Sequence, residues 1–352
     1  MSKAAELAAL IGSQTALSDR NMIINGAMQV AQRSTSETGL GSASDYFTLD
    51  RFIMSINSTS AGRYTMSQSD VNDLEGFSNA LKIQCTTADT SIAAGEVLIL
   101  SQRVEGQNIQ ILKSNSTSSR AFTISFYAKS NESRAISLEA RFSNGTNRQA
   151  ATVHTIGTSW ARYTMTVAAA SSIQIDNDNS NEMQINFFLH AGSNYTSGTI
   201  QGSTLGAADN TKRAAGIGSI FASTSNFIEI TGLQMELGEQ ATPFEHRSFA
   251  DELARCQRYY YETGGTGSND FAQKGYQAAS QFASNTLPHP TTMRSAPTLT
   301  KSGTFSVTNI GQPAAVAASV TNFVWQAQKD GSTGVWGLFS NSSGKFTLDA
   351  EL

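Results

Sequence analysis

The sequence predicts a mostly β chain, in which a two-sheet β-sandwich is followed by a smaller β unit, with only short helices. Three observations support this fold class. Apolar and polar residues alternate over many short stretches, and clusters of Asn, Asp, Ser and Gly separate those stretches. No long helical pattern lies between neighbouring stretches, which disfavours an α/β fold. The length of 352 residues also exceeds what one small core needs.

The composition argues against several classes of protein. Hydrophobic residues make up 39% of the chain and charged residues 15%, which is typical of a folded chain and not of a disordered one. The net charge is −4 and Lys and Arg are scattered singly, so we expect no nucleic-acid partner. No apolar run approaches the ~18 residues of a membrane span, and the N-terminus lacks the layout of a signal peptide. We therefore expect a chain made in the cytoplasm, without membrane insertion.

Residues 1–20 are expected to form an attachment segment. Residues 3–11 have apolar side chains at helical spacing, and Gly12 is suited to end that helix. A helix of about nine residues is unstable alone, so Leu7, Leu10 and Ile11 are candidates for a stabilising contact. That contact lies either within the chain's own domain or with sister chains or another component of an assembly.

Residues 21–247 are expected to form the β-sandwich. Alternation is clearest in four stretches, at 122–127, 136–142, 162–167 and 183–189. A period of two with one apolar face is typical of an antiparallel sheet that packs on one side. Near the end of this domain the apolar phase changes across Thr231 and Gly232, which predicts a β-bulge.

A change of period marks the end of the sandwich. Ser248 and Asp251 form a capping box, and apolar residues at helical spacing predict a helix over roughly 249–261. Gly-rich residues 264–268 then predict a hinge. We expect residues 248–265 to link the sandwich to the next domain.

The remaining residues, 266–352, are expected to form a smaller β domain. Polar neighbours alternate with Phe305 and Val307, with Phe323 and Trp325, and with a final apolar row that reaches Leu352. The C-terminus is therefore expected to lie in a sheet. We find no short internal repeat, which disfavours a β-helix or a fibre shaft.

The sequence contains no complete catalytic or metal-binding pattern, so we expect no enzyme, no metal and no cofactor. The four histidines lack metal-ligand spacing, and GxSxG, P-loop and GxGxxG motifs are missing. Asp176 and Asp178 lie in a run without the full EF-hand pattern, which favours a solvated turn. Cys85 and Cys256 are more simply interpreted as two buried thiols, although a disulfide between them stays open.

Aromatic side chains are the remaining candidates for a binding role, because exposed rings can stack on sugar rings. The candidates are Tyr127, on the polar face of its strand, Tyr195, in a loop, and Trp325 and Trp336. The alternative for each Trp, Trp160 included, is a core position, which its large apolar area favours.

Several segments together resemble tailed-bacteriophage tail-fibre-like virion proteins. The resemblance begins with residues 21–33 (NMIINGAMQVAQR) and 46–52 (YFTLDRF). Residues 122–129 (FTISFYAK), 159–164 (SWARYT) and 233–245 (LQMELGEQATPFE) resemble strands of carbohydrate-binding-module-like jelly rolls. The similarity to the phage group continues through the segments 256–260 (CQRYY), 293–297 (MRSAP) and 349–352 (DAEL).

The resemblance implies a jelly-roll fold and a structural subunit of the virion, either a tail fibre or a short tail appendage. It also implies a homotrimer that contacts other tail or virion proteins and has a candidate role in binding a host-surface glycan. The motifs are strands and turns, so they carry over no ligand residues. Only about twenty residues precede the sandwich, which favours a short appendage over a long fibre.

Three other functions remain as alternatives. The same fold serves capsid or neck decoration proteins, which copy number per particle would identify. A free carbohydrate-binding module is disfavoured by the lack of a signal peptide. A polysaccharide depolymerase is disfavoured because glycoside hydrolysis needs two carboxyl groups at a set separation in a cleft, and the closeness of Glu236, Glu239 and Glu245 in the sequence is poor evidence for such a site.

Overall fold

The structure is a computed structural model and describes residues 19–57, 60–144, 147–265, 271–278, 281–331, 333–341 and 343–352. The predicted N-terminal helix, with Leu7, Leu10 and Ile11, lies outside the described residues. The chain divides into two compact units, Met1–Glu252 and Leu253–Leu352. None of the helices in the described ranges is long and apolar enough to cross a membrane.

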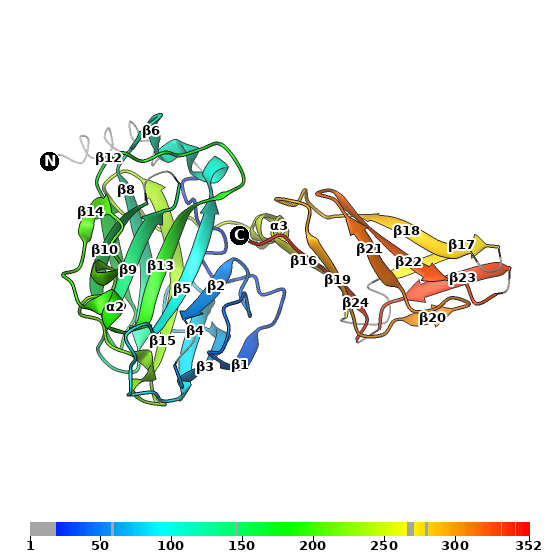
Figure 1. The fold of residues 1–352 in the computed structure, drawn as a ribbon, viewed down its shortest axis with the longest axis horizontal. Coiled ribbons are helices and arrows are strands. Elements are labelled where there is room, and N and C mark those ends of the chain that lie inside the picture. Colours follow the sequence, from blue (N-terminus) through cyan, green and yellow to red (C-terminus); the bar gives the residue numbers. More distant parts are fainter. Residues whose placement is uncertain are drawn as a thin grey trace. The chain divides into compact units, whose positions relative to one another are not determined.

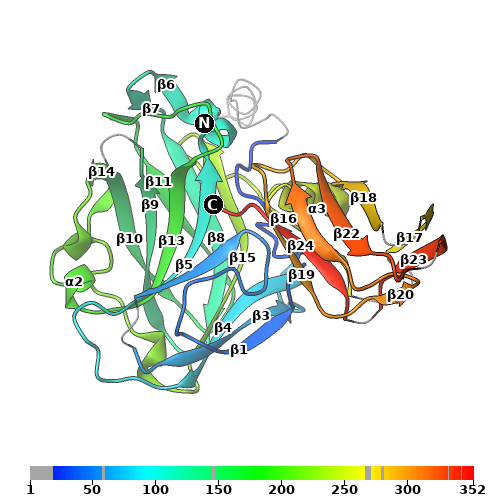
Figure 2. The same ribbon diagram turned by 45° about the vertical axis from the view of Figure 1, so that its right-hand side comes forward.

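Two six-stranded antiparallel sheets form the first unit, the sandwich unit (Figures 1 and 2). The first sheet has the order β1 (Ser36–Leu40), β3 (Arg63–Asp70), β4 (Asn79–Thr87), β15 (Phe227–Leu237), β8 (Phe122–Ser130) and β11 (Ala161–Val167). The second has the order β14 (Gly202–Ala207), β10 (Arg148–Ile156), β9 (Arg134–Phe142), β13 (Asn181–Ala191), β5 (Val97–Glu105) and β2 (Phe52–Asn57).

Shorter elements complete the sandwich unit. The strands β6 (Lys113–Asn115), β7 (Ser118–Ser119) and β12 (Ala170–Ser171) form a small third sheet. The helices are η2 (Gly106–Leu112), α2 (Ser193–Thr196), η3 (Asn210–Lys212) and η4 (Ile220–Ala222).

The strand order confirms the predicted jelly roll. Eight strands form its centre, namely β4, β5, β8, β9, β10, β11, β13 and β15 in chain order. Within the two sheets they lie in the orders β4-β15-β8-β11 and β5-β13-β9-β10. The chain thus passes repeatedly between the sheets, and the last strand pairs beside the first, as the two Greek keys of a jelly roll require.

The alternating residues explain how the two sheets hold together. Phe126 of β8 and Phe187 of β13 face each other across the core, with ring centroids 4.9 Å apart and planes at 79°. Both side chains are fully buried or nearly so. Such edge-to-face packing adds to the free energy of burying the apolar surface. The four stretches with the clearest alternation are therefore strands, as predicted.

The predicted bulge is present in β15. Thr231 pairs with Tyr127 and Gln234 with Ser125, so β15 has one residue more than β8 over this interval. Gly232 sits in the bulge with φ 58°, a conformation that glycine adopts without a steric penalty. The extra residue explains why the apolar phase of the sequence changes at this point.

The helix α3 (Phe249–Gln257) begins where the sequence predicts. The Ser248 hydroxyl accepts the Asp251 backbone N–H at 3.2 Å and donates to the Asp251 carboxylate at 2.6 Å. The helix ends earlier than predicted, because the chain is already extended from Tyr260 onward. The Ser248 cap is therefore confirmed and the C-terminal end of the prediction is wrong.

The second unit, the C-terminal unit, contains three three-stranded antiparallel sheets (Figure 1). The first sheet has the order β16 (Tyr260–Gly264), β24 (Lys345–Asp349) and β19 (Thr298–Ser302). The second has the order β17 (Ala272–Gln277), β23 (Gly334–Phe339) and β20 (Ser306–Thr308). The third has the order β18 (Phe282–Pro288), β22 (Asn322–Gln328) and β21 (Ala314–Ala318).

The boundary of this unit differs from the sequence prediction. Residues 260–264, which the sequence assigned to a linker, form β16 and pair with the last strand, β24. The C-terminal unit therefore begins within α3, at Leu253, and not after the Gly-rich residues 264–268. The predicted position of the C-terminus is confirmed, since β24 lies between two neighbours and the Ala350 N–H donates to the Tyr259 carbonyl.

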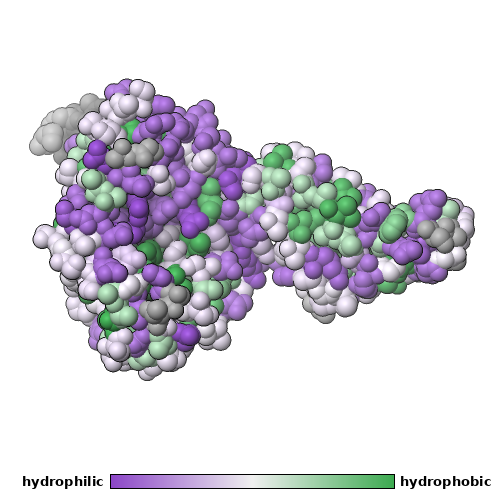
Figure 3. Space-filling view, viewed as in Figure 1, coloured by the Kyte–Doolittle hydropathy of each residue, from purple (hydrophilic) through white to green (hydrophobic). Residues whose placement is uncertain are grey.

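The surfaces of the two units differ in character. Exposed apolar side chains are frequent in the C-terminal unit, where Tyr276 is 70%, Val335 60% and Val316 54% exposed. Figure 3 shows apolar residues gathered over β19 and β21, while the visible face of the sandwich unit is mostly polar.

Candidate functional site

Tyr127 lies on the outward face of β8, as predicted, and is half-buried. Its ring packs 5.3 Å from that of Phe77, and the Arg162 guanidinium lies 5.8 Å from its centroid. Phe77 also contacts Phe244 at 5.1 Å and His246 at 5.2 Å. We call Phe77, Tyr127, Trp160, Phe244 and His246 the aromatic patch. Sequence reasoning identified only Tyr127 of this set as a site residue, because its other members come from loops far apart in the chain.

Trp160 is a half-buried member of this patch, and its indole N–H is paired with a side chain of the same unit. Its indole N–H donates to the Asp73 carboxylate at 2.8 Å, and the Lys129 ammonium lies 4.9 Å from the ring centroid. Lys129 also donates to Asp73 at 2.9 Å. These hydrogen bonds, the one from Lys129 foremost, lower the pKa of Asp73.

Tyr195 is also half-buried and lies on α2, where its ring is 6.3 Å from Phe188 of β13. The segment that follows β13 folds back over the second sheet, and Tyr195 packs there with Ala214 and Ile217. The tyrosine thus covers the outward face of the sheet, which leaves only part of its ring exposed.

Trp325 and Trp336 are core residues, so the expectation of exposed stacking rings is wrong for both. Trp325 is 0% and Trp336 6% exposed. Their rings pack perpendicular to each other, with centroids 5.6 Å apart. A sugar has no access to a ring face that is covered by the unit's own side chains, and the alternative of core anchors applies to both residues.

An ion pair holds the covering segment onto the second sheet. Arg213 donates through Nε to one oxygen of Glu139 at 2.7 Å and through Nη2 to the other at 2.8 Å. Asn186 donates to the same carboxylate at 2.7 Å, and Ser101 donates to Asn186 at 2.6 Å. Glu139 is fully buried. The network stabilises the covering segment, and both carboxylate oxygens of Glu139 take part in it.

The histidines have structural or surface positions, as predicted. His190 is fully buried between Ser219, 2.7 Å from Nδ1, and Glu96, 3.1 Å from Nε2. Burial is the main cause of its lowered pKa. His246 is exposed and packs on the aromatic patch. Within the described ranges, no group of three or more His, Cys, Asp or Glu side chains is placed to hold a metal ion.

The acidic turn at residues 176–180, between β12 and β13, is mostly exposed, as predicted. Asp176 accepts hydrogen bonds from Gln174 and Asn144, and Asp178 accepts from the backbone and hydroxyl of Ser180. Glu182 is 1% exposed, and burial raises its pKa to about 7, assisted by the charges of the two aspartates. Cys85 and Cys256 are both buried and are not joined by a disulfide, as the sequence favoured.

Two of the segments that carry the resemblance, 21–33 and 233–245, meet in one polar network. Asn21 donates to the Leu233 carbonyl at 3.3 Å and accepts the Met235 N–H at 3.1 Å. The Glu245 carboxylate accepts the Asn21 N–H at 2.7 Å. Leu233 N–H donates to the Gly26 carbonyl at 2.9 Å. A Cβ at Gly26 would lie 2.1 Å from the Leu233 oxygen, so only glycine permits this approach.

The same network extends to the start of α3. Arg247 donates to the Ile23 carbonyl at 2.8 Å and lies 3.6 Å from the Glu252 carboxylate. Glu252 in turn accepts the Asn25 N–H at 2.6 Å. The first motif, the closing strand and the first turn of the helix therefore form one structural element. Its residues form hydrogen bonds and ion pairs with one another.

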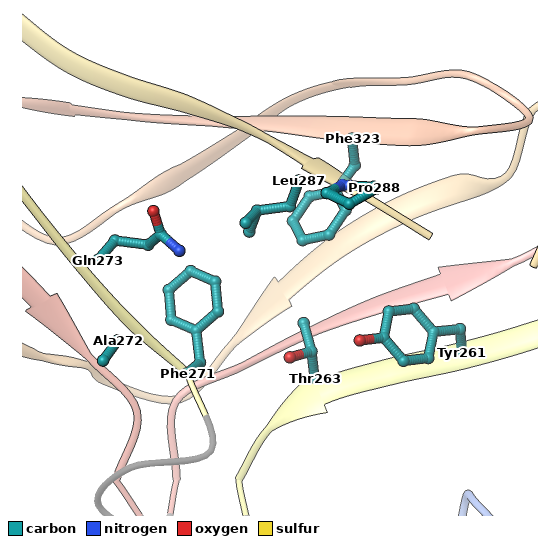
Figure 4. A pocket seen from close by; sticks show the side chains of 8 residues that line it. All are labelled: Tyr261, Thr263, Phe271, Ala272, Gln273, Leu287, Pro288 and Phe323. Carbon is teal, nitrogen blue, oxygen red and sulfur yellow. The ribbon is translucent and has the colours of Figure 1, made fainter. Parts of the chain in front are cut away.

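A pocket of about 340 Å³ lies in the C-terminal unit (Figure 4). Tyr261 and Thr263 of β16 line one side, and Leu287, Pro288 and Phe323 line another. The remaining lining residues are Phe271, Ala272 and Gln273. Sequence reasoning missed this pocket, because its residues come from four separate strands and loops and follow no motif.

Comparisons with known proteins show low similarity. No protein-family model and no curated protein matches the chain. Among solved structures, the enzymatically active domain of Bacteriophage CBA120 tailspike protein 4 is 12% identical, with a TM-score of 0.32. That match covers 62% of this chain and 22% of the tailspike chain, so this chain spans about a fifth of that protein.

Two carbohydrate-binding modules are similar at the same level. TmCBM61, in complex with β-1,4-galactotriose, is 9% identical with a TM-score of 0.31, and the match covers 62% of this chain and 100% of the module. The family 11 module from Clostridium thermocellum, in complex with a mixed-linked tetrasaccharide, is 12% identical with a TM-score of 0.28, over 60% of this chain and 99% of the module. Similarity at this level carries no argument about function.

Proposed function

We propose that the chain is a non-enzymatic structural subunit of a bacteriophage virion, a tail fibre or short tail appendage that also binds a host-surface glycan. The observation that carries this proposal is the polar network around Asn21, Glu245 and Arg247. It joins residues 21–33 to residues 233–245, two of the segments whose order resembles phage tail-fibre-like proteins. These two segments are far apart in the sequence and support each other in one folded element of the sandwich unit.

The glycan-binding part of the proposal is supported by aromatic rings that lie beside polar groups. The aromatic patch presents half-buried Tyr127 and Trp160 next to Asp73 and Lys129. The pocket of the C-terminal unit combines aromatic walls with hydroxyl groups. Carbohydrate sites commonly combine an apolar surface with a few placed polar groups.

The virion role is tested by finding the protein in the particle. Purified virions are labelled with a gold-conjugated antibody against the chain, and we expect gold at the tail. Tails separated from heads by shearing should retain the chain in mass spectrometry. Gold over the head or neck, or a copy number typical of a capsid decoration, would refute the tail assignment. Absence of the chain from particles would favour a free carbohydrate-binding module.

The absence of catalysis has its own test. The purified full chain is incubated with capsular or lipopolysaccharide glycan of the host, and reducing ends are measured over time. We expect no increase over the buffer control. A steady increase, lost on heating the protein, would assign a depolymerase instead.

A further inference from the structure

The pocket of the C-terminal unit differs from the aromatic patch in one respect. In the aromatic patch, the Trp160 indole N–H and the Lys129 ammonium already bind Asp73. In the pocket, the hydroxyls of Tyr261 and Thr263 have no hydrogen-bond partner among the described residues. Two hydroxyls side by side without protein partners are free to bind a ligand.

The two hydroxyl groups share one face of one strand. Tyr261 and Thr263 are two residues apart on β16, so their side chains project to the same side. Both are partly exposed. Figure 4 shows the Tyr261 hydroxyl directed toward Thr263 along the wall of the pocket. This wall therefore offers a pair of donors and acceptors in fixed positions.

The opposite walls are apolar. Leu287, Pro288 and Phe323 lie on one side, and the Phe271 ring lies on another (Figure 4). Phe271 and Phe323 are held rigidly, since the first contacts Phe305 and Trp325 and the second contacts Phe346. Phe271 and Phe323 are buried and form the floor of the pocket, whereas Leu287 and Pro288 present accessible apolar surface. Such a surface suits the C–H face of a sugar ring, while the hydroxyl wall suits its O–H groups.

One amide completes the polar side. The Gln273 side-chain oxygen accepts a hydrogen bond from the Asn285 amide, which fixes the orientation of the side chain. Its amide nitrogen has no partner among the described residues and is left to donate toward the pocket. The residues that line the pocket include no Lys, Arg, Asp or Glu. The lining therefore favours an uncharged ligand over an acidic one.

We infer that this pocket binds a single uncharged sugar ring, a neutral hexose or the terminal hexose of a glycan. The volume of about 340 Å³ lies at the lower end of ligand pockets, which suits one ring and not an oligosaccharide. The inference deepens the proposed function, because it assigns the glycan contact to the C-terminal unit. It does not require the jelly roll to bind sugar.

Saturation-transfer NMR on the full chain tests the inference. The probes are D-glucose, D-galactose and D-mannose at millimolar concentration, with N-acetylneuraminic acid as the charged comparison. We expect saturation transfer to at least one hexose and none to the acid. Tyr261→Phe and Thr263→Val should each raise the dissociation constant by roughly three- to tenfold, as the loss of one ligand hydrogen bond predicts.

Matched control variants lie on the same unit. Tyr276→Phe and Thr286→Val make the same chemical changes at exposed strand positions outside the pocket, and should leave the dissociation constant unchanged. Because the pocket hydroxyls have no protein partner, all four variants should unfold at the temperature of the wild type.

Two results would overturn the inference. One is the absence of saturation transfer to all three hexoses, and the other is binding that the pocket variants and the control variants change equally. Neither result affects the position of the protein in the virion, which gold labelling reports independently. A chain that binds hexose through the pocket but is missing from particles would instead refute the proposed function alone.

Discussion

At the scale of single residues, the sandwich unit contains a buried ion pair between Arg213 and Glu139. Glu139 is fully buried and Arg213 is 7% exposed, so each is stabilised mainly by the other. Removal of one partner leaves a charge in an apolar environment without compensation. Sequence alone does not pair these residues, because 74 positions separate them.

We predict that Arg213→Met destabilises the chain by about 3–5 kcal/mol, since Glu139 is then buried without its partner. Urea unfolding followed by circular dichroism measures the change. The double variant Arg213→Met/Glu139→Gln should recover a large part of the loss, because no charge remains. A loss below about 1 kcal/mol in the single variant would contradict the role of this pair.

Glu182 gives a prediction about pH. Burial raises its pKa in the folded chain to about 7, above the ordinary value of 4.5 that applies to the unfolded chain, so the folded chain binds the proton more tightly. Between these two values the folded state holds more protons, and stability therefore falls as pH rises. Glu182→Gln removes this contribution.

The measurement is the unfolding midpoint in urea at several pH values between about 4 and 8. We expect the wild type to lose stability across this interval relative to Glu182→Gln, with the largest difference above pH 7. Glu75→Gln, the same chemical change at an exposed position in the loop between β3 and β4, serves as the control. Parallel curves for the wild type and Glu182→Gln would show that Glu182 titrates normally.

At the scale of elements, the bulge of β15 sets which side chains face outward. Gly232 has a positive φ, and a Cβ there would lie 2.8 Å from the rings of both Phe77 and Tyr127. A side chain at position 232 would therefore displace the rings of the aromatic patch. The sequence predicted the bulge from the change of phase, but not the rings that pack against it.

We predict that Gly232→Ala destabilises the chain by roughly 1–3 kcal/mol, through both the backbone conformation and the overlap with the two rings. Gly157→Ala is the matched control, because no atom lies within 4 Å of a Cβ at that position and its φ is not positive. Thermal unfolding compares the two. Equal stability of both variants would mean that the bulge tolerates a side chain.

The elements that the sequence predicted well are those whose signal is local. The strands at 122–127 and 183–189 and the Ser248 cap were predicted correctly, because period and capping depend on neighbours in the chain. The end of α3 was not, because the last turn gives way to β16. The pairing of Tyr260 with Asp349 in β24 decides that change, and it lies far away in sequence.

At the scale of the whole molecule, the chain consists of two units with separate cores. The sandwich core includes Phe126 and Phe187, and the second core includes Trp325 and Trp336. Each unit thus buries its own apolar surface, as independent domains do. The sequence predicted two units but placed their boundary at the glycines near residue 265.

We predict that the full chain forms a homotrimer in solution, as the resemblance to tail-fibre-like proteins implies. Sedimentation velocity at micromolar concentration should give one species of three times the chain mass. Dilution over a tenfold range should leave this species unchanged. A monomer throughout this range would contradict the trimer, whereas a dimer would indicate a different closed symmetry.

The sequence by itself determined the β period, the division into two units, the bulge and the helix cap. It also determined which residue types were available for binding. Only the tertiary structure decided which of them are accessible: Trp325 and Trp336 are core residues, Tyr127 and Tyr195 are half-covered, and Tyr261 and Thr263 line a pocket. The physical reason is that alternation depends on neighbours along the strand. Exposure depends instead on which distant segment packs over that strand, and the residues of the strand alone do not predict that segment.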